Sequence, residues 1–147
     1  MKTKIVTIVS FLSLCIIDNS LASRKLNIIS EIANIRSGPG TSYEIMWKAE
    51  QYYPISVLKK RGNWYLFRDF EGDTGWVHKS LLGSVNSVVV IKNKCNIRSG
   101  PSTKNRILFT VEKGVPFKII DKRGNWLKVE HADGDRGWIY KTLVKKF

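Results

Sequence analysis

An internal repeat constrains the fold of this chain more than any other feature of its sequence. Residues 34–82 align with residues 96–144 at a constant offset of 62 and without a gap, and 21 of the 49 aligned positions are identical. Three shared peptides stand out: NIRSGP at 34–39 and 96–101, RGNW at 61–64 and 123–126, and GW at 75–76 and 137–138. A gapless tandem duplication predicts two copies of one small structural unit.

Apolar and polar residues alternate between the turn peptides of each copy, which predicts short half-buried strands. The alternating apolar positions include Ile45, Trp47 and Ala49 in the first copy and Ile107, Phe109 and Val111 in the second. No segment after residue 22 shows a helical period. Each copy is therefore predicted to be an all-β module of five strands, which buries its core best by curling into a closed barrel.

The N-terminus has the three parts of a secretory signal peptide. Lys2 and Lys4 form a basic start, and residues 5–17 are an almost unbroken apolar run. Residues 20–22 (Ser-Leu-Ala) offer small residues, Ser20 and Ala22, at the two subsites of a signal peptidase. The apolar run has 13 residues, whereas a membrane-spanning helix needs roughly 20. Cleavage is therefore favoured over a permanent anchor. A lipoprotein attached through Cys15 is the weaker alternative, because the neighbours of Cys15 are bulky.

The chain is strongly basic, with 25 Lys and Arg residues against 12 Asp and Glu. Residues 1–22 contain two of the Lys and one of the acids, so the exported part keeps 23 basic and 11 acidic residues, a net charge of +12. The second copy is the more basic one: residues 96–144 contain ten Lys or Arg and five acids, and residues 34–82 contain seven and five. Such an excess of positive charge favours an anionic partner.

The order and spacing of the shared motifs resemble a known family. An NIRSGP segment, a central GNW, and a closing GW followed by a short turn that ends in Leu are similar to the bacterial SH3-like domain, often called SH3b. The resemblance implies two tandem five-stranded SH3-like barrels, with a signal peptide at 1–22, the first barrel at 23–84 and the second at 85–147. It also implies a non-catalytic exported binding module, a kind of domain found beside cell-wall hydrolases that engages peptidoglycan or other envelope ligands.

Aromatic residues at outward-facing strand positions are the predicted ligand contacts. If Tyr65 and Phe67 face the core, strand alternation turns Trp64 outward, and Trp126 faces outward in the second copy for the same reason. In the family that the motifs resemble, aromatics of this kind line a groove with the first long loop on one side. By that likeness, one groove has Tyr43, Trp64 and Trp76, and the other has Trp126 and Trp138.

Two alternatives stay open at this point. The guanidinium groups of Arg36 and Arg98 either bridge carbonyl groups of the Gly-rich loop or meet a carboxylate of the ligand. Trp76 and Trp138 either line the grooves, or they cap the barrel ends or pack between the modules. The predicted ligand-binding set is Arg36, Tyr43, Trp64, Trp76, Arg98, Trp126 and Trp138.

The sequence offers no catalytic constellation. His78 and His131 occupy non-equivalent positions and have no Cys or Asp at the spacing of a metal site or a catalytic triad. Cys95 has no partner for an intramolecular disulfide in the exported part, and Ala33 at the equivalent position indicates a small buried side chain rather than a reactive thiol. We therefore expect no catalytic residue, no metal and no cofactor.

The sequence thus predicts an exported module that binds peptidoglycan or another acidic envelope polymer through aromatic grooves and a basic surface. The alternative is an adaptor that binds an envelope or host protein through the same grooves. A nucleic acid would suit the charge, but export opposes it. We expect a monomer, without stable membrane insertion after signal cleavage, in the periplasm or the extracellular envelope. Because no hydrolase domain follows the second barrel, we expect any targeting role to act in trans.

Overall fold

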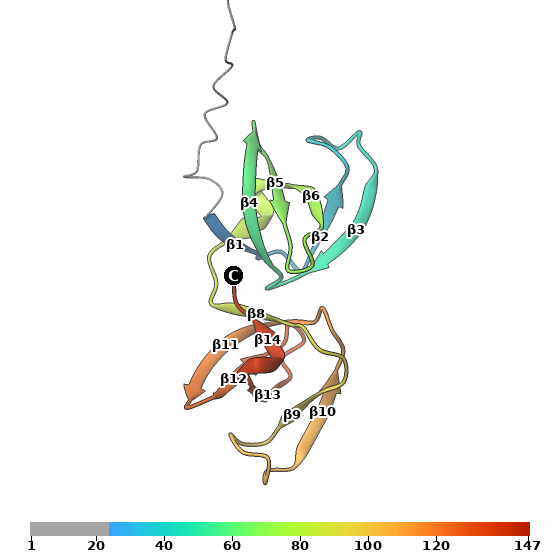
Figure 1. The fold of residues 1–147 in the computed structure, drawn as a ribbon. Coiled ribbons are helices and arrows are strands. Elements are labelled where there is room, and N and C mark those ends of the chain that lie inside the picture. The colour runs from blue at the N-terminus through green and yellow to red at the C-terminus, as the bar shows by residue number, and fades with distance from the viewer. Residues whose placement is uncertain (1–23) are drawn as a thin grey trace, which may run out of the picture.

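Each repeat folds as one strongly curved antiparallel sheet (Figure 1). The structure is a computed structural model that describes residues 24–147, and the predicted signal peptide and its cleavage site lie outside the described residues. Residues 24–147 form fourteen β-strands and two short 3-10 turns, with no α-helix among them. The all-β class predicted from the alternation is therefore confirmed for this part of the chain.

The two sheets have the same strand order. The first contains β1 (Arg24–Ile28), β2 (Ile32–Arg36), β3 (Ile45–Glu50), β4 (Pro54–Arg61), β5 (Trp64–Arg68), β6 (Thr74–His78), the 3-10 turn η1 (Lys79–Leu81) and β7 (Leu82–Gly83). The second contains β8 (Ser87–Val90), β9 (Cys95–Arg98), β10 (Ile107–Val111), β11 (Pro116–Arg123), β12 (Trp126–Glu130), β13 (Arg136–Tyr140), the turn η2 (Lys141–Leu143) and β14 (Val144–Lys145). Across the sheets the orders are β3-β2-β6-β5-β4-β1-β7 and β10-β9-β13-β12-β11-β8-β14.

The prediction of five strands per module was wrong, because each sheet has seven. The five strands that the repeat predicts are β2 to β6 and β9 to β13. Each sheet adds one strand before them, and these two strands have the dissimilar sequences RKLNI and SVVV. Each sheet also ends in a two-residue strand, which is too short to show any alternation. The predicted domain boundary between residues 84 and 85 falls in the connection between β7 and β8.

Ile45 and Ile107 were predicted to face the core, and the structure corrects this. Their side chains are 41% and 48% exposed. The pairing of β3 with β2 skips Met46, and the pairing of β10 with β9 skips Leu108. An extra residue in one strand of a pair is a β-bulge, and it breaks the alternation on which the prediction depended.

Each sheet curls around its own apolar core. The fully buried side chains include Ile35, Ile55, Val57, Phe67 and Val77 in the first core and Ile97, Phe117, Val129 and Ile139 in the second. Trp47 lies beside the first core, as its phase predicted, with its ring centroid 5.4 Å from Tyr53 and 6.2 Å from Phe67. Both aromatic pairs meet edge to face, a favourable arrangement of ring quadrupoles.

Strand β8 belongs to the second sheet but contributes to both cores. Val88 and Val90 lie in the second core, whereas Val89 is fully buried in the first. Asn27 of β1 fixes the connection between the sheets, because its side-chain amide donates a hydrogen bond to the hydroxyl of Ser87. The unbroken run of valines is thus explained by burial on both faces of the strand.

The two barrels meet end to end through reciprocal turns (Figure 1). The β5–β6 turn of the first barrel contacts the β10–β11 turn of the second, with a carboxylate oxygen of Glu71 3.7 Å from the Lys113 ammonium. The residue after β12 contacts the end of β3, with His131 Nε2 3.3 Å from Glu50 Oε2. Each barrel thus contributes the same two turns, and each turn meets the other kind of turn in the partner barrel, as in a two-fold symmetric interface. The barrels therefore form a packed pair rather than two domains on a flexible tether.

A buried carboxylate shapes the first barrel's side of this interface. Asp69 is 6% exposed. It accepts hydrogen bonds from the Tyr53 hydroxyl at 3.1 Å and from the backbone N–H groups of Glu71 and Asp73 at 2.9 and 3.0 Å. Burial, together with the neighbouring carboxylate, raises the pKa of Tyr53 well above its usual range. His131 occupies the equivalent position in the second barrel, so the two copies build this turn differently.

Candidate functional site: a duplicated groove

A groove lies at the same place on each barrel, beside the loop that follows the NIRSGP strand. Seven residues line the first groove, and each has its counterpart 62 positions further on among the residues that line the second. The pairs are Ile32 and Lys94, Asn34 and Asn96, Arg36 and Arg98, Thr41 and Thr103, Trp64 and Trp126, His78 and Tyr140, and Leu81 and Leu143. Because every lining position of the first groove recurs in the second, the groove is a property of the repeated fold.

Two aromatic rings on neighbouring strands form one wall of each groove. Trp64 and His78 are directly opposite in the register of β5 and β6, and their ring centroids are 5.2 Å apart. Trp126 and Tyr140 repeat the arrangement on β12 and β13 at 5.3 Å. Phe67 lies in the core, so alternation along β5 turns Trp64 to the outer face of the sheet, as predicted. Both tryptophans are half-buried.

An arginine from the NIRSGP strand lies in each groove in a fixed position. Arg36 Nη1 donates hydrogen bonds to the backbone carbonyl oxygens of Thr41 and Tyr43, at 3.0 and 2.9 Å. Arg98 Nη1 makes the two equivalent bonds in the second barrel, both 3.0 Å long. The guanidinium therefore bridges loop carbonyls, which was one of the two alternatives. These bonds use a single nitrogen, so they do not occupy the Nε and Nη2 hydrogens of the guanidinium.

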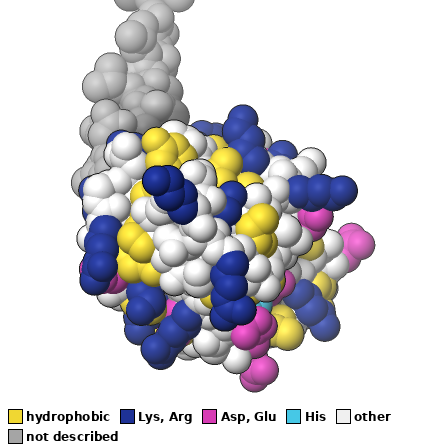
Figure 2. Space-filling view, turned by 90° about the horizontal axis from the view of Figure 1, so that it is seen from below, with side chains coloured by type: hydrophobic (Ala, Val, Ile, Leu, Met, Phe, Trp, Pro, Cys, Tyr) yellow, Lys and Arg dark blue, Asp and Glu magenta, His cyan; other side chains and the backbone are white. Residues whose placement is uncertain are grey.

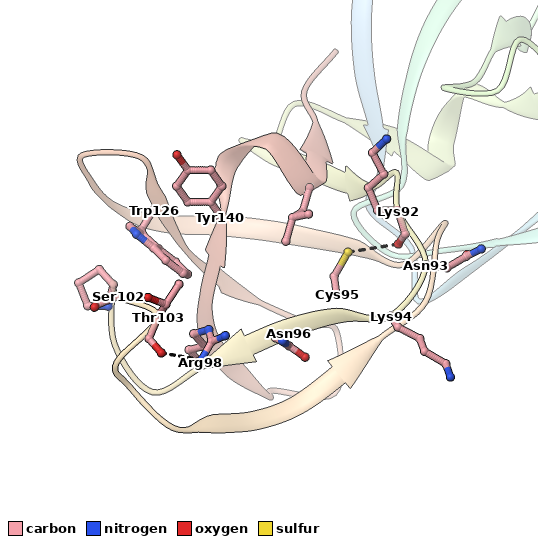
Figure 3. Close-up of a pocket in the computed structure, with 12 residues that line it drawn as sticks. Lys92, Asn93, Lys94, Cys95, Asn96, Arg98, Ser102, Thr103, Trp126 and Tyr140 are labelled. Carbon is pink, nitrogen blue, oxygen red and sulfur yellow. Dashed lines mark hydrogen bonds between the residues drawn. The ribbon is translucent and has the colours of Figure 1, made fainter.

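The second groove is larger and more basic than the first. The volumes are about 640 and 220 Å³. The second groove extends past the shared positions to the β8–β9 turn, and the added lining residues are Lys92, Asn93, Cys95, Pro101 and Ser102. Figure 3 shows Trp126 and Arg98 toward one end of this groove and the turn of residues 92–94 at the other. Lys and Arg side chains also spread among apolar patches on the outer end of the second barrel (Figure 2).

The structure brings together four of the seven predicted site residues: Arg36 and Trp64 line the first groove, and Arg98 and Trp126 line the second. The ring of Tyr43 instead packs on the NIRSGP loop. A Cβ on Gly38 would lie 2.3 Å from that ring, so only glycine permits the contact. Tyr43 is still 47% exposed, but it is not among the residues that line the groove.

Trp76 and Trp138 also lie outside the two sets of lining residues. Trp138 is only 6% exposed, and the guanidinium of Arg123 lies 5.6 Å from its ring centroid. Trp76 is half-buried and is directly opposite Arg36 in the register between β6 and β2. This geometry corresponds to packing on the side of each barrel rather than to a groove wall.

Sequence reasoning missed the second aromatic of each wall. From the sequence, His78 is weighed only for catalysis or metal binding and Tyr140 is not singled out, yet each is the cross-strand neighbour of a groove tryptophan. The signal that could have found them is the GD turn peptide, which joins β5 to β6 and β12 to β13. A hairpin register assigned from that turn would have placed position 78 opposite position 64.

Cys95 lies on the floor of the second groove but is shielded from solvent. It is 2% exposed, and its thiol donates a hydrogen bond to the carbonyl oxygen of Lys92 at 3.2 Å. Burial raises the pKa of the thiol, so it stays protonated near neutral pH.

Cys95 should therefore react slowly with a thiol reagent in the folded protein. Labelling with Ellman's reagent at mildly alkaline pH is expected to be about 100-fold slower than in the urea-unfolded chain, because reaction needs local opening of the barrel. Stopped-flow absorbance of the two samples measures the ratio. Equal rates would show that the thiol is accessible and would contradict its placement.

Two features are absent from residues 24–147. They contain no group of three or more His, Cys, Asp or Glu side chains arranged to hold a metal ion. They also contain no helix with the length and apolar character needed to cross a bilayer.

Proteins similar to this chain include bacterial amidases. YrvJ of Bacillus subtilis, named as an N-acetylmuramoyl-L-alanine amidase, is 28% identical over 128 residues, which are 80% of this chain and 24% of YrvJ. LytH of Staphylococcus aureus, named as a cell wall amidase, is 36% identical over 52 residues, which are 35% of this chain and 18% of LytH. The chain therefore spans a quarter or less of the length of these relatives.

Among solved structures, an NlpC/P60 family protein from Bacillus cereus is similar over 83% of this chain and 56% of its own, at 16% identity and a TM-score of 0.41. At that TM-score the likeness supports no inference. The family model for the bacterial SH3 domain is more informative, because it matches the chain twice, at residues 30–83 and 92–146. These two ranges correspond to the two sheets and together make up most of the sequence. The chain belongs to the bacterial SH3 domain family, of which it contains two tandem copies.

Proposed function

We propose that this protein is an exported, non-catalytic binding module that engages peptidoglycan or another acidic polymer of the cell envelope through its two grooves. The observation that carries the proposal is the duplicated groove, in which a guanidinium fixed by loop carbonyls lies beside a half-buried tryptophan. An arginine of this kind suits a carboxylate or a phosphate, and an aromatic face suits an apolar or sugar surface.

The relatives support a partner in the cell wall. LytH is named as a cell wall amidase and YrvJ as an N-acetylmuramoyl-L-alanine amidase. The aligned parts are minor fractions of those proteins, so the similarity favours a shared binding module and not a shared reaction. Residues 23–147 have a net charge of +12, which favours an acidic polymer.

A protein partner is the second candidate, and a specific observation favours it. β3 and β10 are edge strands of their sheets. Each carries two consecutive exposed apolar side chains at equivalent positions: Ile45 and Met46 in the first barrel, Ile107 and Leu108 in the second. Edge strands with exposed apolar residues can pair with an extended segment of another protein.

Co-sedimentation with purified sacculi separates the two candidates. The mature protein should sediment with sacculi equally well before and after proteinase treatment if the ligand is the polymer. Binding should weaken from about 0.1 M to about 1 M salt, because the Debye length falls from about 10 Å to about 3 Å. Loss of binding after proteinase treatment would assign the partner as a protein, and no binding to either sample would refute the proposal.

Export predicts a defined N-terminus for the mature protein. Cleavage after Ala22 should give a chain that begins at Ser23, and Ala22→Trp should block processing because the peptidase subsite accepts only small residues. Intact mass of the protein recovered from the envelope fraction measures both outcomes. A recovered chain that retains Lys2 and Lys4 would contradict export by this route.

A further inference from the structure

We infer that the second groove binds an extended peptide segment with two carboxylates, one toward each end of the groove, whereas the first groove binds a segment with one. The inference rests on the proposed function and specifies the ligand class of one of its two grooves. It follows from the places where the two copies of the groove differ.

The first step is the charge of the groove walls. The lining of the second groove includes Arg98, Lys94 and Lys92 and no carboxylate. At the equivalent positions the first copy has Arg36, Ile32 and Ser30, so only the arginine is shared. Figure 3 places Arg98 and the 92–94 turn toward opposite ends of the groove. The second groove therefore has positive charge at both ends, and the first has it at one.

The second step is the backbone that carries the lysines. The N–H of Ile91 donates to the carbonyl oxygen of Leu143 at 2.9 Å, and the thiol of Cys95 donates to that of Lys92 at 3.2 Å. The first barrel has the equivalent bond from Ile29 to Leu81, also 2.9 Å. The two turns thus start from the same anchored place in the fold. Beyond it they differ in side chains and also in backbone, because Lys94 has a left-handed backbone (φ 54°) and Ile32 does not.

The third step is the absence of an internal partner for the two lysines. Among the ion pairs of residues 24–147, none includes Lys92 or Lys94. Both side chains are exposed. Their long flexible stems let the ammonium groups reach over the mouth of the groove toward an anionic group on a ligand.

The uncharged lining of the groove suits a peptide backbone better than a phosphate chain. Besides its basic side chains, the lining offers the ring of Trp126, the amides of Asn93 and Asn96, and the hydroxyls of Ser102 and Thr103. Amide and hydroxyl groups can both donate and accept hydrogen bonds, as peptide groups require, whereas a run of phosphates needs donors alone. The arginine fork is complementary to a carboxylate.

A peptide series tests the inference on the mature chain, residues 23–147. The probes are N-acetyl-Ala-Glu followed by one, two or three alanines, which carry two carboxylates. The matched controls have Gln in place of Glu, or Gln and a C-terminal amide, and carry one carboxylate or none. In an NMR titration at low salt, the best dicarboxylate should bind the second groove about threefold to tenfold tighter than its Gln control, the gain expected when one added carboxylate meets the exposed ammonium groups of Lys92 and Lys94.

The repeat supplies reciprocal variants. Lys92→Ser with Lys94→Ile gives the second groove the residues of the first, and the preference for two carboxylates should disappear. Ser30→Lys with Ile32→Lys should create that preference in the first groove. All four positions lie in or beside exposed turns, and Ile32 is 55% exposed. Position 94 has a left-handed backbone (φ 54°), which strains a β-branched residue, so Lys92→Ser with Lys94→Asn is tested beside it. Amide spectra show whether each variant is folded.

Equal binding of every dicarboxylate and its Gln control would overturn the inference, as would a preference that survives Lys92→Ser with Lys94→Ile. If glycerol phosphate competes for the second groove better than the best dicarboxylate, the ligand is a phosphate polymer and the peptide assignment is wrong. Sacculus binding by the same proteins distinguishes a failure of this inference from a failure of the proposed function. Retention of the protein on sacculi without a dicarboxylate preference refutes only this inference, whereas loss of sacculus binding by the wild type refutes the proposed function.

Discussion

Trp126→Ala is expected to weaken binding to purified sacculi by about 5- to 150-fold, the effect of removing a central aromatic anchor worth about 1 to 3 kcal/mol. The ring forms the wall of the larger groove and is half-buried. Ring contact does not depend on ionic screening, so the loss should be of similar size at low and high salt. Binding isotherms from sacculus co-sedimentation at about 0.1 M and about 1 M salt measure it.

One control variant alters the first groove, and the other makes a conservative change in the second groove. Trp64→Ala alters the smaller groove and should have the smaller effect, while Trp126→Phe keeps a ring against Tyr140 and should retain most of the binding. Loss of the edge contact with Tyr140 costs about 0.5 to 1.5 kcal/mol, so the Ala variant should stay folded and keep its β-sheet circular dichroism. If folded variants bind as wild type at both salts, the aromatic groove is wrong, and the basic surface of residues 96–147 becomes the better candidate.

Strand alternation in the sequence is enough to predict the outward-facing tryptophan of each groove. The phase of β5 places Phe67 in the core and Trp64 on the outer face, and the constant offset transfers that placement to Trp126. The NIRSGP arginine was weighed between two roles, and the hydrogen bonds to loop carbonyls show how it is held. These residues were predictable because their positions depend on local periodicity and on neighbours close in sequence.

The rest of the site depends on contacts that a local pattern does not encode. Trp138 shares the phase of Trp126 on its hairpin, yet Arg123 from a third strand covers it. Tyr43 could pack on Gly38 only once the long loop had closed on itself. Ile45 and Ile107 are exposed because bulges at Met46 and Leu108 break the alternation between these residues and the rest of their strands.

Val89→Asp is expected to lower the free energy of unfolding by about 3 to 5 kcal/mol, because it places an unpaired carboxylate in a fully buried apolar site. The position is informative because its strand belongs to one barrel and its side chain lies in the core of the other. Ile91 and Phe147 pack against the same core from the second half of the chain. The first barrel is therefore completed by residues that follow it in sequence.

This arrangement makes a prediction about cooperativity. If the barrels were independent, Val89→Asp would destabilise only the second, which contains β8. Because Val89 lies in the first core, amide hydrogen exchange should instead speed up in both barrels, including the buried strand β5, as the opening free energy of each falls. Val89→Ala is the control that removes apolar contact without adding charge, and it should have the same pattern at a smaller size. Unchanged exchange in β5 of the Asp variant would show that the first barrel does not depend on β8.

The Val89→Ala variant also tests whether the packing between the two barrels contributes to binding. Under the proposed function, once one groove has bound a repetitive polymer, the other is held near it at a high effective concentration, and a loosened pair would lose part of that advantage. A protein with Val89→Ala should therefore bind a single soluble peptide as the wild type does but bind sacculi more weakly, because its individual grooves are intact and only their relative placement is relaxed. Isotherms with both ligands, on samples shown to be folded, measure the difference. An equal loss with both ligands would instead mean that the substitution has damaged a groove.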